Sequence, residues 1–415
     1  MSRYIIRRFL QAVPTLLFVS IVVYGLITIS PVDPLAIYED NPNITPEDMA
    51  MLEYRLGLRQ PAFLNFRGSA GTLNTDVTLL NKVPSAESLE PTVTGELPAG
   101  TKVAIVDGTT DERGERWIKV LHVDSRTTGW TLREHADIRV NPLDSRYFKW
   151  LFALLQGDLG YSNVEHRPAL EMILERLPAT LLLMSVSFIG QLLIGLPIGV
   201  ISAVKQYSLF DHVFTILAYA GRSIPIFWFG LILIILFHST LTWPEWAGDM
   251  AGKPLFPGGG MYDVRLRQEL GYTPWWDYVY HLILPVVMLS VFGAAQYMRY
   301  MRASMLEVIH QDYIRTARAK GLTERAILYG HALKNAAIPV VTVMALGLPI
   351  LFAGALFTET IFSWPGMGKL YFRSAQRVDY AVLMGYLMIS ATLIIFFNIV
   401  ADIVYALLDP RIRYE

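Results

Sequence analysis

The chain has 415 residues, of which 53% are hydrophobic and only 17% are charged, and its formal net charge is −1. Charged residues make up about 25% of an average soluble domain, so this composition favours a membrane protein. The sequence contains no cysteine, which excludes a disulfide framework, a thiolate zinc site and a cysteine nucleophile. The same composition argues against disorder and against a surface that binds nucleic acid.

Six apolar stretches are long enough to cross a bilayer, which takes roughly 20 residues. They lie near residues 9–30, 179–203, 213–238, 280–298, 336–357 and 381–408. The first follows a cluster of Arg3, Arg7 and Arg8 but is too long for a secretory signal, so we interpret it as a retained anchor. Prolines inside the stretches, such as Pro225, predict kinks or broken turns within the spans.

The basic residues of the connecting loops predict the orientation. With the N-terminus inside the cell, the inner segments carry 13 Lys and Arg residues, and the short outer loops 241–279 and 358–380 carry 6. Seven of the inner ones lie in the loop 299–335. The excess of positive charge inside therefore predicts cytoplasmic N- and C-termini and an extracytoplasmic segment 31–178.

The outer segment changes composition between residues 68 and 140. Short runs at 101–106 and 117–121 are rich in β-branched and apolar residues, and turn-rich stretches separate them. Such runs predict a small β-barrel or sandwich inserted among the helices. Residues 47–58 are expected to form a short surface helix.

Two interfacial helices are predicted between the β insertion and the second span. The aromatic-rich stretch 147–155 favours an amphipathic helix at the membrane interface, and a second is expected near 168–177. The predicted organisation is 1–30 as the N-terminal transmembrane helix, 31–67 as an extracytoplasmic segment, 68–140 as the β insertion, 141–178 as interfacial helices, and 179–415 as a five-helix core.

Catalytic motifs are absent from the sequence. Gly368-Lys369-Leu370 lacks the earlier glycine and the following hydroxyl of a phosphate-binding loop, and no zinc-protease or serine-hydrolase motif occurs. The chain is therefore not expected to be an enzyme.

The basic loop between the fourth and fifth spans is the most informative soluble segment. On a helix, Tyr313, Ile314, Ala317 and Gly321 would share one face, after which the glycine ends the helix and Thr323 caps the next one. A short helix, a glycine and a second helix could fill a groove on a soluble partner. The same loop could equally be held by anionic lipid headgroups.

Several motifs follow one another in a definite order along the chain. The loop itself reads Tyr313 to Leu322, followed by His331 to Ala336. The other motifs are Leu56 to Pro61, Gln156 to Gly160, Glu175 to Thr180, Ser223 to Pro225, Glu359 to Phe362, Trp364 to Gly368, and Leu408 to Arg411. This set closely resembles bacterial ABC-transporter permeases of the dipeptide/oligopeptide/nickel family. Arg315-Thr316-Ala317 stands where the wider class has Glu-Ala-Ala, with the same spacing to Gly321.

The resemblance implies a non-catalytic subunit of the bacterial plasma membrane that imports peptides by alternating access. Its partners would be a second homologous permease, two cytoplasmic ATPases that hold ATP and Mg²⁺, and an external binding protein. No cofactor or metal is expected on this chain, and no nucleic acid. Contact with an ATPase would fall on Asp312, Tyr313, Arg315, Thr316, Ala317, Gly321, Leu322 and Arg325.

Polar residues inside the spans are further candidates. Arg222 lies inside the third span, where an unpaired charge costs about 2.5–3.5 kcal/mol. We therefore expect it to face a wet cavity or a carboxylate partner, and Arg222, Ser223 and Pro225 are candidates for the translocation pathway, where Arg222 would contact a peptide carboxylate or carbonyl. The alternative is a structural pair or a bond to backbone carbonyls near the proline. Asp402, near the end of the last span, is expected to pair with a basic residue.

The insertion 68–140 resembles a bacterial SH3-like domain through Leu97 to Val103, Arg116 to Val120 and Thr128 to Trp130. Trp117 and Trp130 are expected in its core. Its role is left open between packing on neighbouring outer loops, docking of the binding protein and contact with the cell wall.

The predicted fold is an all-α polytopic membrane protein with six transmembrane helices and a small extracytoplasmic, SH3-like β-barrel insertion. The predicted function is the permease subunit of an ATP-driven peptide importer. The alternatives are the same class carrying nickel chelates, glutathione or cationic peptides, or a membrane-anchored protein that binds the cell wall.

Overall fold

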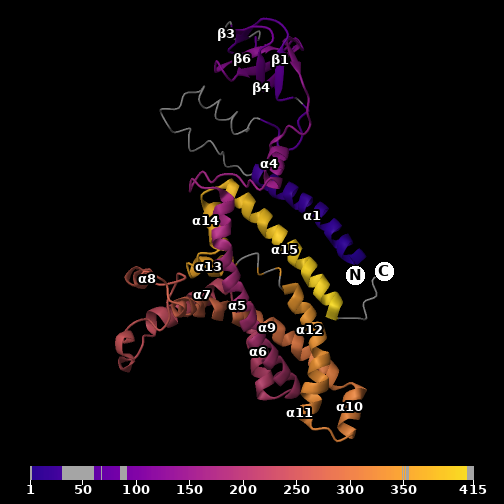
Figure 1. The fold of residues 1–415 in the computed structure, drawn as a ribbon, viewed down its shortest axis with the longest axis vertical. Helices are drawn as coiled ribbons and strands as arrows, with labels where there is room; N and C mark the ends of the chain where they lie inside the picture. The colour runs from indigo at the N-terminus through magenta and orange to yellow at the C-terminus, as the bar shows by residue number, and fades with distance from the viewer. Residues whose placement is uncertain are drawn as a thin grey trace. The chain divides into compact units, whose positions relative to one another are not determined.

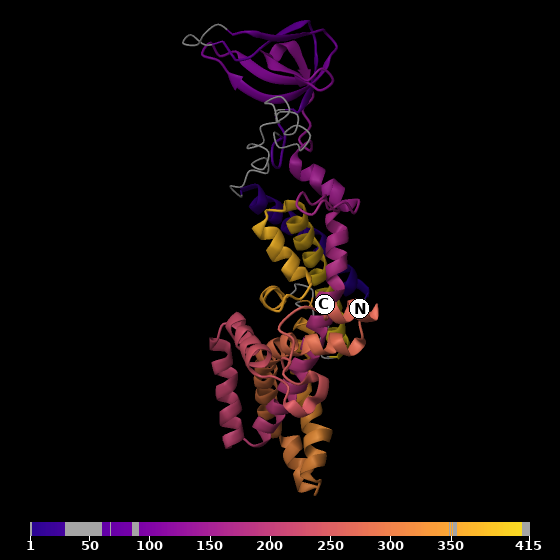
Figure 2. The same cartoon turned by 90° about the vertical axis from the view of Figure 1, so that its left-hand side faces the viewer.

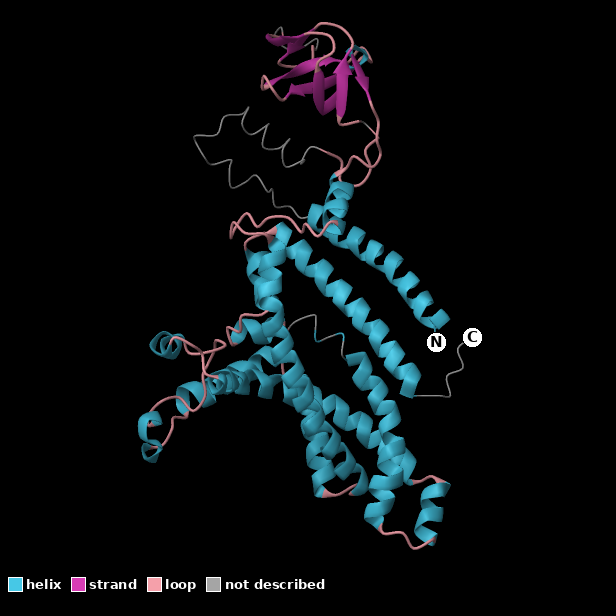
Figure 3. Ribbon diagram, viewed as in Figure 1, coloured by secondary structure: helices cyan, strands magenta, loops and turns pink. Residues whose placement is uncertain are grey.

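The computed structural model describes residues 2–29, 60–66, 68–84, 91–347, 349, 351 and 355–408 (Figure 1). The chain forms two compact units: Ser20–Leu159, called the β unit below, and Met1–Val19 with Gly160–Glu415, called the helical unit. Figure 3 shows that the strands lie in the β unit. The helix expected at 47–58 lies outside the described residues.

The β unit contains one antiparallel sheet in the order β3-β2-β6-β5-β4-β1-β7, which curls strongly in Figure 2. A 3-10 turn, η1 (Arg133–His135), connects β6 to β7 along the chain. The strands are β1 (Ala70–Leu73), β2 (Val77–Leu80), β3 (Val93–Leu97), β4 (Lys102–Thr110), β5 (Arg116–His122), β6 (Thr127–Leu132) and β7 (Ala136–Ile138). The two runs expected to be strands fall on β4 and β5, so that prediction is confirmed.

The sheet closes over a small apolar core. Its buried members are Leu73, Val77, Leu79, Leu97, Val103, Ile118, Val120 and Ala136. Trp117 is buried as expected, but Trp130 is only half-buried. Placing Trp130 in the core was wrong because neighbours along a strand point to opposite faces, and Gly129 and Thr131 take the buried positions of β6.

The predicted amphipathic helix at 147–155 is confirmed as α4 (Arg146–Leu155). The Ser145 hydroxyl caps it by accepting a hydrogen bond from the Phe148 N–H at 3.4 Å. Tyr147 packs against Tyr24 of α1 (Ser2–Ile29), with ring centroids 5.4 Å apart, and its hydroxyl lies 2.8 Å from Ser20 Oγ. Buried aromatic contacts therefore hold α4 against the end of the first helix within the β unit.

The helical unit contains most of the apolar helices. Within the part of the chain that the structure describes, five helices are long and apolar enough to span a bilayer, or six if a bent pair of helices counts as one span. The helices after α4 are α5 (Ala169–Val204), α6 (Leu209–Ser223), α7 (Ile226–Ile234), α8 (Val264–Leu270), α9 (Trp275–Ile309), α10 (Asp312–Ala319), α11 (Glu324–Ala326), α12 (Leu333–Gly347), α13 (Leu356–Ile361), α14 (Met367–Gln376) and α15 (Tyr380–Leu408). Three further segments are the π-helical η2 (Ile235–Thr240) and η4 (Ile327–Ala332) and the 3-10 helix η3 (Glu245–Met250).

The third predicted span is broken, as its proline suggested. Helix α6 and the α7–η2 segment meet at an angle of 104°, and Pro225 is the residue that precedes α7. Proline has no backbone N–H to donate, and it disfavours helical geometry in the residue before it. A helix therefore begins at or just after a proline more readily than it continues through one.

The second interfacial helix expected near 168–177 is not a separate element. Helix α5 runs without a break from Ala169 to Val204 and includes Pro178 and Pro197. Each proline removes one backbone hydrogen bond, and packed helices in membranes tolerate such a loss. The prediction of two elements here was therefore wrong.

Helices α5 and α9 are packed along a line of glycines. A Cβ on Gly195 would lie 2.6 Å from the Ala294 carbonyl oxygen, and one on Gly199 would lie 2.6 Å from the Met298 carbonyl oxygen. Small residues four positions apart allow helix backbones to approach this closely.

The expected pairing of Asp402 is confirmed. Its Oδ2 lies 3.2 Å from Nε of Arg8, which connects α15 to α1 within the helical unit. A carboxylate and a guanidinium that neutralise each other lower the cost of placing both in apolar helices.

Candidate functional site

The loop between α9 and α12 folds as two short helices on the surface of the helical unit (Figure 1). Ile314 and Ala317 of α10 are 0% and 8% exposed. They belong to a buried cluster that includes Met305 of α9, Ile327 of η4 and Ala336 of α12. Helix α10 is therefore fixed to the ends of two long helices by its apolar face.

Gly321 ends α10 as the sequence predicted. It has a positive φ of 78°, its N–H donates to Arg318 O at 3.0 Å, and the Leu322 N–H donates to Ala317 O at 3.3 Å. This pair of bonds is a Schellman motif, which usually places glycine at the left-handed position. A Cβ on Gly321 would meet nothing within 4 Å, so glycine is required for conformation and not for space.

Helix α11 begins at the predicted cap. The Thr323 hydroxyl accepts a hydrogen bond from the Ala326 N–H at 3.3 Å. Across the glycine turn, Arg318 donates to both carboxylate oxygens of Glu324, from Nε at 2.7 Å and from Nη2 at 3.3 Å. The two helices are thus joined by a turn with a defined geometry and by a bidentate ion pair.

Most of the predicted contact residues are on the free surface of this loop. The exposed ones are Asp312, Tyr313, Arg315, Thr316, Gly321, Leu322 and Arg325, whereas Ala317 is buried. Tyr313, expected on one face with Ile314 and Ala317, is 41% exposed, and its hydroxyl accepts from Asn335 Nδ2 at 3.1 Å. Positions three or four apart on a helix share a face, so Tyr313 lies beside Ala317 at the edge of the buried face, while Ile314 and Ala317 form its centre.

A second cluster joins three of the recognised motifs, Glu175 to Thr180, Glu359 to Phe362 and Trp364 to Gly368. The Glu359 carboxylate of α13 is fully buried and accepts from the Thr180 hydroxyl of α5 at 2.8 Å and from the Lys369 N–H at 3.0 Å. The Thr180 hydroxyl oxygen accepts in turn from the Met367 N–H at 2.7 Å. Hydrogen bonding of this kind is what permits a carboxylate to be buried.

The residues around Glu359 leave no spare volume. A Cβ on Gly366 would lie 2.4 Å from the Glu359 carboxylate, and the Trp364 indole N–H donates to Ala179 O at 2.8 Å. The sequence showed all three motifs but indicated no role for Thr180 or Glu359. An acid inside an apolar region was the available signal, since such a group needs partners.

The candidates at the break of the third span are only partly described. Ser223 is exposed, and its hydroxyl donates to Tyr219 O at 3.4 Å. The side chain of Arg222 lies outside the described part of the structure. Among the described residues, no three His, Asp or Glu side chains form a group that could hold a metal ion.

The apolar helices and the surface loop define an integral membrane protein of the polytopic helical class. Residues 195–414 match the family of binding-protein-dependent transport system inner membrane components, and residues 1–75 match the corresponding N-terminal family. The chain belongs to this family of transport permeases. Residues 76–194, which include most of the β unit, lie between the two matches.

The chain is similar to several curated permeases over 66% of its own length and 82% of theirs. It is 44% identical to the oligopeptide transport system permease protein AppB of Bacillus subtilis. It is 42% identical to the dipeptide transport system permease protein DppB of Escherichia coli and 43% identical to the di/tripeptide protein of the same name from Pseudomonas aeruginosa. A solved chain of the MetNI methionine ABC transporter is 20% identical over 57% of this chain and 96% of that one, with a TM-score of 0.41.

Proposed function

We propose that this chain is a membrane subunit of an ATP-driven importer of short peptides. The support for peptides as cargo is that relatives sharing 42–44% of aligned residues are named for oligopeptide or dipeptide transport. The same names do not favour nickel chelates, glutathione or cationic peptides, nor an anchor for the cell wall. In this proposal both termini are cytoplasmic, residues 31–178 are outside, and the positive-inside bias supports that orientation.

The observation that carries the proposal is the exposed α10–Gly321–α11 surface, which Ile314 and Ala317 fix to the ends of α9 and α12. A partner that binds this surface and moves would therefore move the ends of α9 and α12 with it. In our proposal the partner is one of two ATPase subunits that hold ATP and Mg²⁺, while this chain hydrolyses nothing. ATP binding changes the transport state only if the ATPases contact one permease state more favourably than the other.

Alternating access then requires a second, homologous permease and a binding protein that delivers peptide from outside. Arg222, Ser223 and Pro225 are proposed to face the pathway, because the helix break between α6 and α7 frees backbone carbonyls that a polar solute can use. In this assignment the β insertion, 68–140, is an SH3-like domain outside the membrane, and 179–415 is the transporting core.

The proposal is tested by purifying the tagged chain in mild detergent with its subunits and measuring ATP hydrolysis. Reversing charge on the exposed surface, in Arg315→Glu with Arg325→Glu, should release the ATPases because both side chains are exposed on the loop. The matched control is Arg265→Glu on α8, which is also exposed but lies outside the loop. Equal recovery of ATPase subunits with both variants would refute the assigned contact surface.

A further inference from the structure

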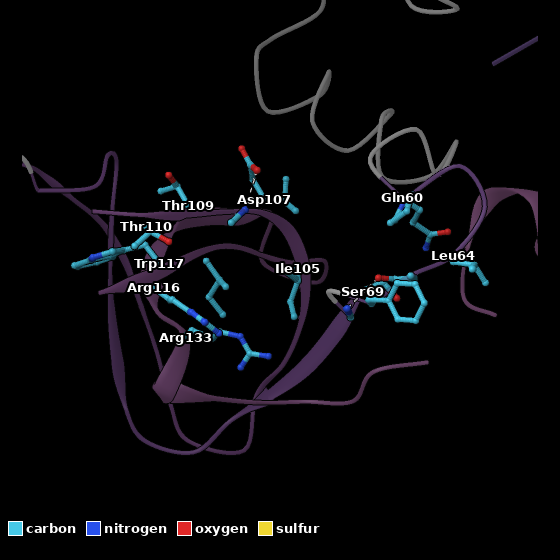
Figure 4. A pocket seen from close by; sticks show the side chains of 17 residues that line it. Gln60, Leu64, Ser69, Ile105, Asp107, Thr109, Thr110, Arg116, Trp117 and Arg133 are labelled. Carbon is cyan, nitrogen blue, oxygen red and sulfur yellow. Dashed lines mark hydrogen bonds between the residues drawn. The ribbon is translucent and has the colours of Figure 1, made fainter. Parts of the chain in front are cut away.

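A groove of about 750 Å³ is cut into the β unit. Its walls come from β4, from the start of β5, from Arg133 of η1 and from described residues within 60–66 and 68–69. Figure 4 shows Trp117, Thr109 and Thr110 at one end and Gln60 and Leu64 at the other, with Arg116, Arg133 and Ile105 between them. A volume of this size is typical of sites for small ligands, which lie in the range of about 300–1,000 Å³.

One wall of the groove is an open strand edge. Strand β5 pairs with β4 as far as Thr110, whereas β1 pairs only with Lys102 to Ala104. Among the described residues, Asp107 to Thr110 therefore have a strand on one side only, and all four line the groove. Unpaired edges accept an added strand from a peptide.

The backbone geometry shows which groups are free on this edge. The Asp111 N–H donates to Glu115 O at 2.9 Å, so the alternating antiparallel pattern directs the peptide groups of Gly108 and Thr110 away from β5. The Gly108 N–H already donates to the Asp107 carboxylate at 2.8 Å, so the Gly108 carbonyl and the N–H and carbonyl of Thr110 are the groups left for an added strand. Four strand residues span about 13 Å, which matches a tripeptide or tetrapeptide.

The groove is lined by two arginines and one carboxylate, that of Asp107, and this net positive charge favours an anionic ligand. Arg116 and Arg133 both line it, and among the described residues neither forms an ion pair. The Trp117 indole beside them is fixed by donating to Asp111 Oδ2 at 3.2 Å. Guanidinium groups recognise carboxylates through paired hydrogen bonds, so two unpaired arginines beside an open edge are suited to a peptide carboxylate.

We propose that the groove binds a short, extended peptide with a free carboxylate, which adds to the open edge of β4 while Arg116 and Arg133 hold its negative end. This binding goes beyond the transport function proposed above, because it needs neither the ATPases nor a second permease. It assigns the β insertion a ligand of its own.

The test measures fluorescence anisotropy of a labelled peptide, Val-Thr-Val-Asp with a free C-terminus, on the full-length chain in detergent without partner subunits. Amidation of both carboxyl groups of the probe, or the double variant Arg116→Gln with Arg133→Gln, should weaken binding by about tenfold or more. N-methylation of alternate peptide nitrogens should also abolish binding, because it removes the strand hydrogen bonds without altering the protein.

Arg113→Gln is the matched control, since Arg113 lies at the tip of the same hairpin and is exposed but does not line the groove. It should bind as the wild type does. Absence of binding to the wild-type chain, equal binding of the amidated probe, or an equal loss in the control would overturn the proposal. Because no transport is measured, these results leave the proposed import function to its own test.

Discussion

Replacement of Gly321 gives the sharpest test of how the surface loop transmits motion. Its φ of 78° is a region that residues with a Cβ occupy at a cost of about 1–2 kcal/mol. A Cβ would meet no atom within 4 Å, so this conformational cost is the whole direct effect of the Ala substitution. A free-energy change of this size alters the population of the left-handed turn that ends α10 by a factor of about 5–30.

The expected order of peptide uptake in proteoliposomes with all subunits is wild type, then Gly321→Asn, then Gly321→Ala, with Gly321→Val lowest. Asparagine tolerates the left-handed region and β-branched residues do not. Membrane insertion should be unchanged in all of them, because the glycine is exposed and outside the buried cluster. The readouts are uptake, ATP hydrolysis stimulated by the loaded binding protein, and the amount of chain in the membrane.

The matched control is Gly330→Ala. Gly330 lies in η4 close to the same loop, has equally open space around its Cα and has no positive φ. It should transport normally. Normal uptake by Gly321→Val would refute the reasoning, as would a loss in the control that equals the loss in Gly321→Ala.

Three further predictions concern stability of the purified chain in detergent, followed by its thermal transition. Gly195→Val should lower the stability of the chain by about 1–3 kcal/mol, because the new side chain meets the backbone of α9. Gly221→Val is the control and should leave stability unchanged, because a Cβ there lies in open space. Equal transition temperatures for the two variants would contradict the close packing of α5 on α9. Glu359→Gln should cost about 1–3 kcal/mol because an amide cannot accept at both positions, and an unchanged transition would argue against the buried network. Burial raises the pKa of the Asp379 carboxyl above its ordinary value of 3.8. Stability should therefore fall as the pH rises from 3.8 through the raised pKa, and Asp379→Asn should remove that fall. The same dependence of stability on pH in the variant and the wild type would contradict this prediction.

Several elements were predictable because short stretches of chain determine them. The left-handed glycine and the threonine cap of the surface loop depend on a few adjacent residues, as does the break before Pro225. Strand-forming runs and the apolar stretches were recognised for the same reason. The expectation failed for Trp130, because a strand alternates its faces and only the packed sheet decides which face of β6 is buried.

The sequence by itself determined the membrane class, the transport family, the surface loop and the presence of a β insertion. Length, hydropathy and motif order carry that information locally. Only the tertiary structure decided that Thr180 meets Glu359, 179 positions away, and that Arg8 is the partner of Asp402. It also decided that, among the described residues, Asp107 to Thr110 of β4 have a strand on one side only, beside two arginines. Such contacts depend on how distant segments pack, and a buried acid or an unpaired edge indicates the need for a partner without identifying it.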